Sequence, residues 1–353
     1  MTGRLISRTI AWAVAMAGGC TLLGGGSAAA GTLTLNFNAL TNGGLLSGCN
    51  LWTVTPYSGP GLGEFGYTTP CSGHPMQMWF EPLPGTPTPP AGARASFQIA
   101  APAGVTITSA TVTAATIQNI NNGQGWGGGS FYQGGGGLWH NGETYEHDGP
   151  ISSSYWGFAM ICGWSSCTKV GGIYPSTISL TATENTGPSL TAIGGNNLWY
   201  QAGHWIWNPS GDPFPLTMDS QDVSGVCTMS AQVGPLSLNA PASYRLNTLW
   251  QQCEERTGSN EWAPNVDTSS LMPGSGQLPL SIASTNAAGV TSGVNETLSV
   301  DNVPVRVSMA TPNDADPNAW VGHAVTVASS VSTGPSGVGG HDCSVDGVNH
   351  AYS

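Results

Sequence analysis

W-N-P-S-G-D-P-F-P-L-T-M-D-S-Q-D-V-S-G-V-C-T-M-S-A-Q-V-G, which runs from Trp207 to Gly234, is the stretch that decides the fold of this chain. A second stretch, from Trp320 to Gly347, reads W-V-G-H-A-V-T-V-A-S-S-V-S-T-G-P-S-G-V-G-G-H-D-C-S-V-D-G and repeats its phrasing. In both copies a Trp leads towards a strand, a polar turn carries Ser-Gly-Val, and a Cys lies in a second strand that ends in Gly. The copies are offset by about one small domain, which predicts an array of similar modules.

The composition predicts a turn-rich all-β protein. The chain has 353 residues, enough for two or three domains, and 39% of them are hydrophobic, which allows several small cores. Only 7% of the residues are charged, while Gly and Pro number 51 and 25. The formal net charge of −12 repels phosphate and argues against nucleic acid or an anionic membrane as a partner. Lys169 is the only lysine, which excludes lysine Schiff-base and Walker-type chemistry elsewhere in the chain.

Residues 1–30 have the pattern of a secretory signal peptide. Arg4 and Arg8 precede an apolar run, and an A-x-A site predicts cleavage after Ala30. The run is too short for a membrane anchor. Lipoprotein processing at Cys20 is a second alternative, although the leucine usually found three residues before such a cysteine is missing. We therefore expect an exported protein, secreted or held at the cell surface, with no membrane span.

Without Cys20, seven cysteines remain, which is an odd number for an oxidising compartment. Pairing between neighbours leaves Cys343 alone, ten residues before the last residue, Ser353. The simplest explanation is a partner encoded further on, so we expect a truncated chain. The expected disulfides are Cys49–Cys71, Cys162–Cys167 and Cys227–Cys253.

Alternating and β-branched stretches predict strands along the whole chain, and no stretch has a sustained helical period. The longest stretch, Ala95–Ile117, fits two strands joined at Pro102-Ala103-Gly104. A break at Asn185–Pro188 places the end of the first domain near Glu184, so the expected domains are residues 31–184, 185–302 and 303–353, the last one incomplete. The other expected strands are Thr32–Leu40, Met76–Phe80, Trp156–Ile161, Ser176–Thr183, Ser189–Ile193, Leu198–Tyr200, Leu278–Ala283, Thr297–Val300, Val305–Met309 and Ala324–Ala328.

The D-x-S-G-V motif at Asp222–Val226 and the later V-D-G at Val345–Gly347 resemble the tandem immunoglobulin-like repeats of secreted and surface bacterial proteins. The resemblance covers about residues 185–350 and implies β-sandwich modules. Ser and Gly suit a tight turn with a positive φ at the glycine, and Asp222 is expected to cap backbone amides in that turn. Calcium binding by Asp222 is the alternative. The second copy has Gly334 at the Asp position.

The first domain is similar to the jelly-roll sandwiches of extracellular lectin-like modules, through the pattern F-x-I-x-A-P-x-G-x-x-I at Phe97–Ile107. Aromatic side chains on or beside its glycine-rich loops are candidates for a platform that stacks on a glycan. Burial in the core is the alternative, because aromatic residues dominate sandwich interiors. The candidate glycan-binding residues are Trp126, Phe131, Tyr132 and Trp139.

Two acidic clusters are candidates for catalysis or metal binding. Glu143, Glu146 and Asp148 lie in the densest titratable segment, which runs from His140 to Asp148 and also contains His147. Paired carboxylates can act as general acid and base. The segment contains no H-E-x-x-H pattern, and a loop beside a sandwich explains it as well. The candidate calcium ligands are Asp301, Asp314 and Asp316, for which solvated loop polarity is the alternative.

We therefore predict an all-β protein with a jelly-roll-like β-sandwich followed by immunoglobulin-like β-sandwich repeats. The favoured interpretation is a non-catalytic binding or structural role at the bacterial cell exterior, with an extracellular glycan as the ligand of the first domain. One alternative is a polysaccharide or peptidoglycan hydrolase that uses the carboxylates at 143–148, and another is a passive spacer. No cofactor other than Ca²⁺ is expected, and the sequence leaves the oligomeric state open.

Overall fold

A computed structural model describes 16 segments of the chain. They are residues 30–38, 51–55, 64–68, 76–81, 94–113, 116–118, 125–127, 137–139, 150–161, 171–175, 177–208, 210–245, 249–310, 328–337, 342–345 and 348–351.

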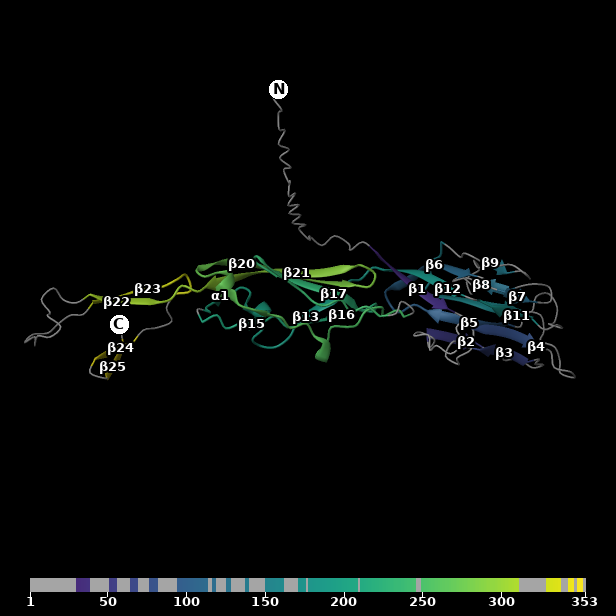
Figure 1. Cartoon of the computed structure of the whole chain (residues 1–353), viewed down its shortest axis with the longest axis horizontal. Coiled ribbons are helices and arrows are strands. Elements are labelled where there is room, and N and C mark those ends of the chain that lie inside the picture. The colour runs from purple at the N-terminus through teal and green to yellow at the C-terminus, as the bar shows by residue number, and fades with distance from the viewer. Residues whose placement is uncertain are drawn as a thin grey trace, which may run out of the picture.

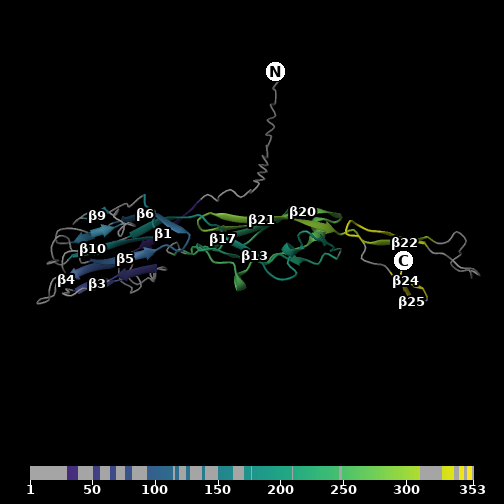
Figure 2. The ribbon, with the colours of Figure 1, turned by 180° about the vertical axis from the view of Figure 1, so that it is seen from behind.

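The all-β prediction is confirmed. The described elements are strands apart from the single-turn helix α1 (Thr268–Leu271) and the 3₁₀ helices η3 (Leu198–Gln201) and η4 (Gly258–Asn260). The strands lie in three successive groups along the long axis of the molecule: N-terminal (β1–β12), central (β13–β21) and C-terminal (β22–β25) (Figures 1 and 2). In the described part of the chain, no helix has the length and apolarity needed to cross a membrane.

The N-terminal group contains the predicted pair of strands, which belong to two different sheets. β5 (Arg94–Ala100) and β6 (Val105–Thr113) are separated by a short connection at the predicted place, where Gly104 has a φ of +86°. β6 pairs with β12 (Thr177–Glu184), which pairs in turn with β1 (Gly31–Asn38). The remaining strands of this group are β2 (Trp52–Thr55), β3 (Glu64–Thr68), β4 (Gln77–Glu81), β7 (Thr116–Gln118), β8 (Gly125–Gly127), β9 (Gly137–Trp139), β10 (Tyr155–Ile161) and β11 (Gly171–Tyr174). Together with β5 these strands form two sheets, ordered β2-β5-β10-β8-β9 and β3-β4-β11-β7.

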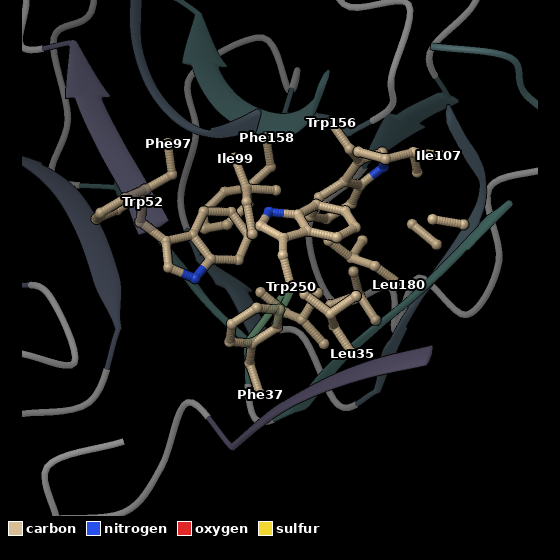
Figure 3. Packing of buried hydrophobic residues seen from close by; sticks show 14 of the residues in the cluster. Leu35, Phe37, Trp52, Phe97, Ile99, Ile107, Trp156, Phe158, Leu180 and Trp250 are labelled. Carbon is tan, nitrogen blue, oxygen red and sulfur yellow. The ribbon is translucent and has the colours of Figure 1, made fainter. Parts of the chain in front are cut away.

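Inward positions of these sheets build the first hydrophobic core. Every second residue of β12 is buried, so Ile178, Leu180 and Ala182 point inward. Aromatic side chains fill the middle of the core, where the rings of Phe37 and Trp52 meet edge to face at 5.3 Å. Figure 3 shows this cluster, and one of its members, Trp250, comes from the central group.

The central group is built around one five-stranded sheet with the order β14-β21-β20-β17-β18. β20 (Ser275–Asn286) and β21 (Thr291–Asp301) form its long hairpin. The other strands of the sheet are β14 (Trp205–Ile206), β17 (Val226–Val233) and β18 (Leu236–Asn239). The pairs β13 (Ser189–Ala192) with β16 (Met218–Gln221), and β15 (Phe214–Pro215) with β19 (Asn265–Val266), lie beside it. One face of the sheet covers the second core, which includes Met229, Leu280, Ile282, Leu298 and Val300.

One predicted strand of the central group is wrong. Leu198–Tyr200 belongs to the 3₁₀ helix η3 rather than to a strand. The side chain of Asn197 accepts a hydrogen bond from the backbone N–H of Trp199 at 3.0 Å, which caps the helix. This local capping interaction favours a helical turn and lets Leu198 enter the second core.

The C-terminal group has two hairpins, β22 (Arg306–Ala310) with β23 (Ala328–Ser332), and β24 (Asp342–Val345) with β25 (Val348–Ala351). The second hairpin turns between Val345 and Val348, as the β17–β18 hairpin does between Val233 and Leu236, 112 positions earlier. In this register Cys343 lies opposite His350, at the place that corresponds to Ala231. Cys227 lies four positions earlier in its strand, so the two cysteines do not correspond by register.

Candidate functional site

Most of the residues predicted to bind or react lie outside the described segments. These include all three candidate catalytic carboxylates. Trp126 and Trp139 lie on the neighbouring strands β8 and β9, in positions paired with Leu138 and Gly125. The structure therefore brings their backbones together. The predicted residues outside the described segments are Phe131, Tyr132, Glu143, Glu146, Asp148, Asp314 and Asp316, together with the pairs Cys49–Cys71 and Cys162–Cys167.

The Ser-Gly-Val turn of the central group has the predicted geometry. Asp222 Oδ1 accepts hydrogen bonds from the backbone N–H and the hydroxyl of Ser224, both at 2.9 Å, as expected for a turn-capping aspartate. Gly225 has a φ of +81°, and a Cβ at this position would overlap the carbonyl oxygen of Cys253. Cys227 and Cys253 form the predicted disulfide, with Cα atoms 5.0 Å apart. The turn is thus fixed to the segment around Cys253.

A cluster of carboxyl groups lies where the N-terminal group meets this turn. Glu184, the last residue of β12, is fully buried. The side-chain nitrogen of Asn286 lies 3.1 Å from Glu184 Oε2 and 3.3 Å from both carboxylate oxygens of Asp222. Asn286 Oδ1 accepts from the backbone N–H of Val290 at 2.8 Å, which fixes the amide with its nitrogen towards the two acids. One amide group therefore bridges a carboxyl of the N-terminal group and a carboxyl of the central group.

The environment of Glu184 favours its protonated form. The pKa of Glu184 is raised to about 7, mainly by burial and also by the nearby charge of Asp222 and a hydrogen bond with that carboxyl, while a hydrogen bond with the Ser224 side chain acts in the opposite direction. A protonated Glu184 can donate a hydrogen bond to the neighbouring Asp222 carboxylate. If both groups were ionised, the two negative charges would repel each other. The junction is consequently most favourable while Glu184 keeps its proton.

A tryptophan from the central group completes the same junction. Trp250 is only 6% exposed and belongs to the first core, where its ring lies among aromatic and aliphatic side chains of the N-terminal strands (Figure 3). Nearby, Gln252 donates from Nε2 to the carbonyl oxygen of Thr34 at 2.7 Å. The β20–β21 turn adds Ala288 and Val290 to the first core. We call this set of contacts, made by Glu184, Asp222, Asn286 and Trp250, the first joint.

A second joint connects the central and C-terminal groups. Asp301, the last residue of β21, is buried and accepts a hydrogen bond at Oδ2 from the backbone N–H of Ser336 at 2.8 Å, and also one from the Ser336 hydroxyl. Gly337 has a φ of +76°, close to that of Gly225. A Cβ on Gly334 would overlap the Asp301 carboxylate. The carboxylate from the preceding strand thus takes the place that the turn's own Asp222 has in the first copy.

The two joints differ in their electrostatics. Burial opposes the ionisation of Asp301, but hydrogen bonds from Ser336 and from the backbone N–H of Val303 hold the pKa of this carboxyl below its usual value. The surroundings of Asp301 therefore favour the charged carboxylate, whereas those of Glu184 favour the protonated acid. The candidate calcium ligand Asp301 uses its carboxylate to hold the next turn, and among the described residues no group of three or more His, Cys, Asp or Glu side chains is close enough to hold a metal ion.

Known proteins add no further information about this site. No protein-family model matches the chain, and no curated protein matches it with significant similarity.

Sequence reasoning missed three of the residues that make the joints. Glu184 was identified only as the place where the first domain ends, and Trp250 was not singled out. Asp301 was considered as a metal ligand. A shared signal exists, because each of the two acids is followed directly by Asn and, soon after, by Pro: E-N-T-G-P at 184–188 and D-N-V-P at 301–304.

Proposed function

We propose that this protein is an exported, non-catalytic component of the bacterial cell exterior, which holds its N-terminal sheets at a distance on a stiff row of β-modules. The first joint carries this proposal, because it fixes one module to the next through a shared core and not through a flexible linker. We further propose that the central and C-terminal groups are immunoglobulin-like repeats and that the N-terminal group is a jelly-roll module.

Three physical features support this proposal. Trp250 from the central group completes the core of the N-terminal group, so separating the two would expose apolar surface on both sides. The Cys227–Cys253 disulfide suits an oxidising compartment. Residues 1–30 have the pattern of a secretory signal peptide, which supports export independently of the disulfide.

Small-angle X-ray scattering on the purified chain tests the stiffness. We expect the wild type to give one extended shape, and Trp250→Ala to broaden the distribution of distances within the molecule because the first joint loosens. Tyr244→Ala is the matched control, since Tyr244 is a highly exposed aromatic residue near the same turn. A wild-type chain that scatters as a flexible string would contradict the proposal.

Cellular location and ligand binding need separate measurements. Protease applied to intact cells should remove the chain from the outside, and a chain protected inside the cell would contradict export. A glycan array with wild type and Trp126→Ala tests a ligand of the N-terminal group. Release of reducing sugar that is lost in Glu146→Gln would replace the non-catalytic proposal with a hydrolase.

A further inference from the structure

The central sheet has one face that no described element covers and that differs from an ordinary surface in its chemistry. It is the face opposite the second core, and we call it the outer face. Its side chains alternate with the buried ones along β21, so Asn295, Thr297 and Ser299 point outward between core residues such as Leu298 and Val300. The outward residues of β20, β17 and β18 that line the same face are likewise small or polar: Ser, Ala, Gln, Asn and Pro.

An exposed tryptophan forms the edge of this face. β14 pairs in parallel with β21, which places Trp205 beside Ser299 and Ile206 beside Val300. Ile206 and Val300 are both buried, so Trp205 and Ser299 point outward. Gln277 follows on the next strand, opposite Ser299. The row Trp205, Ser299, Gln277 thus crosses three adjacent strands, each about 4.8 Å from the next.

Two shallow hollows run along the outer face. The first has a volume of about 450 Å³ and is lined by polar residues that include Gln277, Asn295, Thr297 and Ser299. The second, of about 320 Å³, lies over β17, β18 and β20. They are neighbours on the sheet, because Asn295, which lines the first, is paired with Ser281, which lines the second. The five strands of the sheet span roughly 19 Å at the usual strand spacing, and we call the two neighbouring hollows on them the track.

The unusual feature of the outer face is the solvent exposure of the Trp205 side chain. Trp205 is 45% exposed and Trp207, two positions further along, is 59% exposed, although large aromatic rings gain most from burial. Exposed rings beside a hollow are typical of interaction surfaces, because a rigid aromatic ring offers a large contact area with little loss of conformational freedom. A partner of this face would cover a flat ring at one end and meet amides and hydroxyls along the rest.

The charge of the face narrows the class of partner. Among the residues that the structure describes, Glu296 is the only charged one that lines either hollow, and the chain as a whole has a net charge of −12. Anionic partners are therefore repelled, and a protein partner held by ion pairs or by a large apolar contact finds neither on this face. An uncharged sugar has the matching chemistry: its ring C–H groups carry partial positive charge and stack on the negative face of an indole, and its hydroxyls exchange hydrogen bonds with Gln, Asn, Ser and Thr.

We propose that the outer face of the central sheet is a binding site for an uncharged polysaccharide chain, with Trp205 stacking on one sugar ring and Gln277, Asn295 and Thr297 bonding to hydroxyls of the following ones. This site is separate from the N-terminal residues considered above. It also does not depend on stiff joints, so a flexible chain would leave it intact.

The test is a binding assay of the full chain on microcrystalline cellulose, chitin and mannan, with alginate as the anionic polysaccharide. We expect retention on at least one uncharged polymer and none on alginate. Trp205→Ala should weaken that retention about tenfold, as truncation of an anchoring aromatic residue does at other interfaces. Tyr244→Ala, which removes an exposed ring that lines neither hollow, should leave the retention unchanged.

A second variant covers the outcome in which Trp205→Ala disturbs the fold. Thr297→Lys adds a long side chain at an exposed outward position of β21, so it should block the track without affecting the core. Thermal unfolding followed by circular dichroism should show wild-type stability for Thr297→Lys. The proposal is overturned if the chain binds none of the three uncharged polymers, if alginate is retained equally, or if binding survives Thr297→Lys and is lost in Trp126→Ala.

Discussion

Replacing Glu184 by Gln should make the molecule more stable at high pH and leave it nearly unchanged at low pH. In the folded protein the carboxyl is fully buried next to Asp222 and shares the Asn286 amide with it. A glutamine has the same shape as the protonated acid, offers an oxygen to Asn286 and an N–H group to Asp222, and cannot ionise. Glu184→Gln therefore keeps the protonated geometry of the first joint at every pH.

The size of the effect follows from the pKa of Glu184, which rises from 4.5 to about 7 on folding. Below pH 4.5 both folded and unfolded chains hold the proton, so there is no penalty. Between pH 4.5 and 7 only the folded chain still holds it, and stability falls as the pH rises through this window. Each pKa unit corresponds to about 1.4 kcal/mol, so the full penalty above pH 7 is about 3 kcal/mol.

Urea unfolding of wild type and Glu184→Gln at several pH values between 4.5 and 8 measures this penalty. All other titrating groups are shared, so the difference between the two free energies of unfolding isolates Glu184. It should grow from near zero to about 3 kcal/mol, or roughly 6 to 12 °C in melting temperature. Glu296→Gln, which removes the same charge from an exposed position, is the matched control. Parallel curves for wild type and Glu184→Gln across the whole range would refute the reasoning.

Three further changes test the first joint and its turn. Trp250→Ala should lower the free energy of unfolding by about 3 to 5 kcal/mol, because it opens a cavity in the first core. Tyr244→Ala, at an exposed position, should change it by less than about 0.5 kcal/mol. Equal urea midpoints for the two variants would argue against the packing of Trp250. Cys253→Ser should cost about 3 to 4 kcal/mol, because it frees a loop whose two cysteines are 26 residues apart in sequence; a variant as stable as the oxidised wild type would count against the disulfide. Gly225→Ala and Gly289→Ala both place alanine at a φ above +80°, at a cost of about 1 to 2 kcal/mol each. Only the alanine at 225 also meets a backbone carbonyl, that of Cys253, so Gly225→Ala should have the lower melting temperature. The reverse order would be inconsistent with the turn.

Local features of the sequence were sufficient to predict the fold class and most strands. The alternation of β12 and the β-branched residues of β5 and β6 fix which face is buried, and this depends only on neighbours along the chain. The Ser-Gly-Val turn was predictable for the same reason, because its cap from Asp222 and its positive φ at Gly225 involve residues three positions apart. The strand prediction at Leu198–Tyr200 failed because Asn197 offered a competing local cap.

The joints could not be predicted in this way, because their residues are far apart in sequence. Trp250 enters a core otherwise built mainly from residues 33–182, and nothing in its own neighbourhood indicates that. The absence of an acid at Gly334 looked like a departure from the turn pattern, but Asp301, 35 positions before Ser336, supplies the carboxylate. A capping carboxylate that is missing from the turn itself can thus come from a distant part of the chain, and only the folded structure shows which residue supplies it.

The positions of the joint residues within the central group also have a consequence for how the protein could gain further modules. The central group has a receiving turn near its beginning, at Ser224, and an outgoing carboxylate at its very end, at Asp301. Each copy of this segment brings one half of the connection on either side. Duplication of the corresponding stretch of gene would supply both halves again, but the turn of the new copy would need a glycine in place of Asp222, as at Gly334, to leave room for the Asp301 carboxylate.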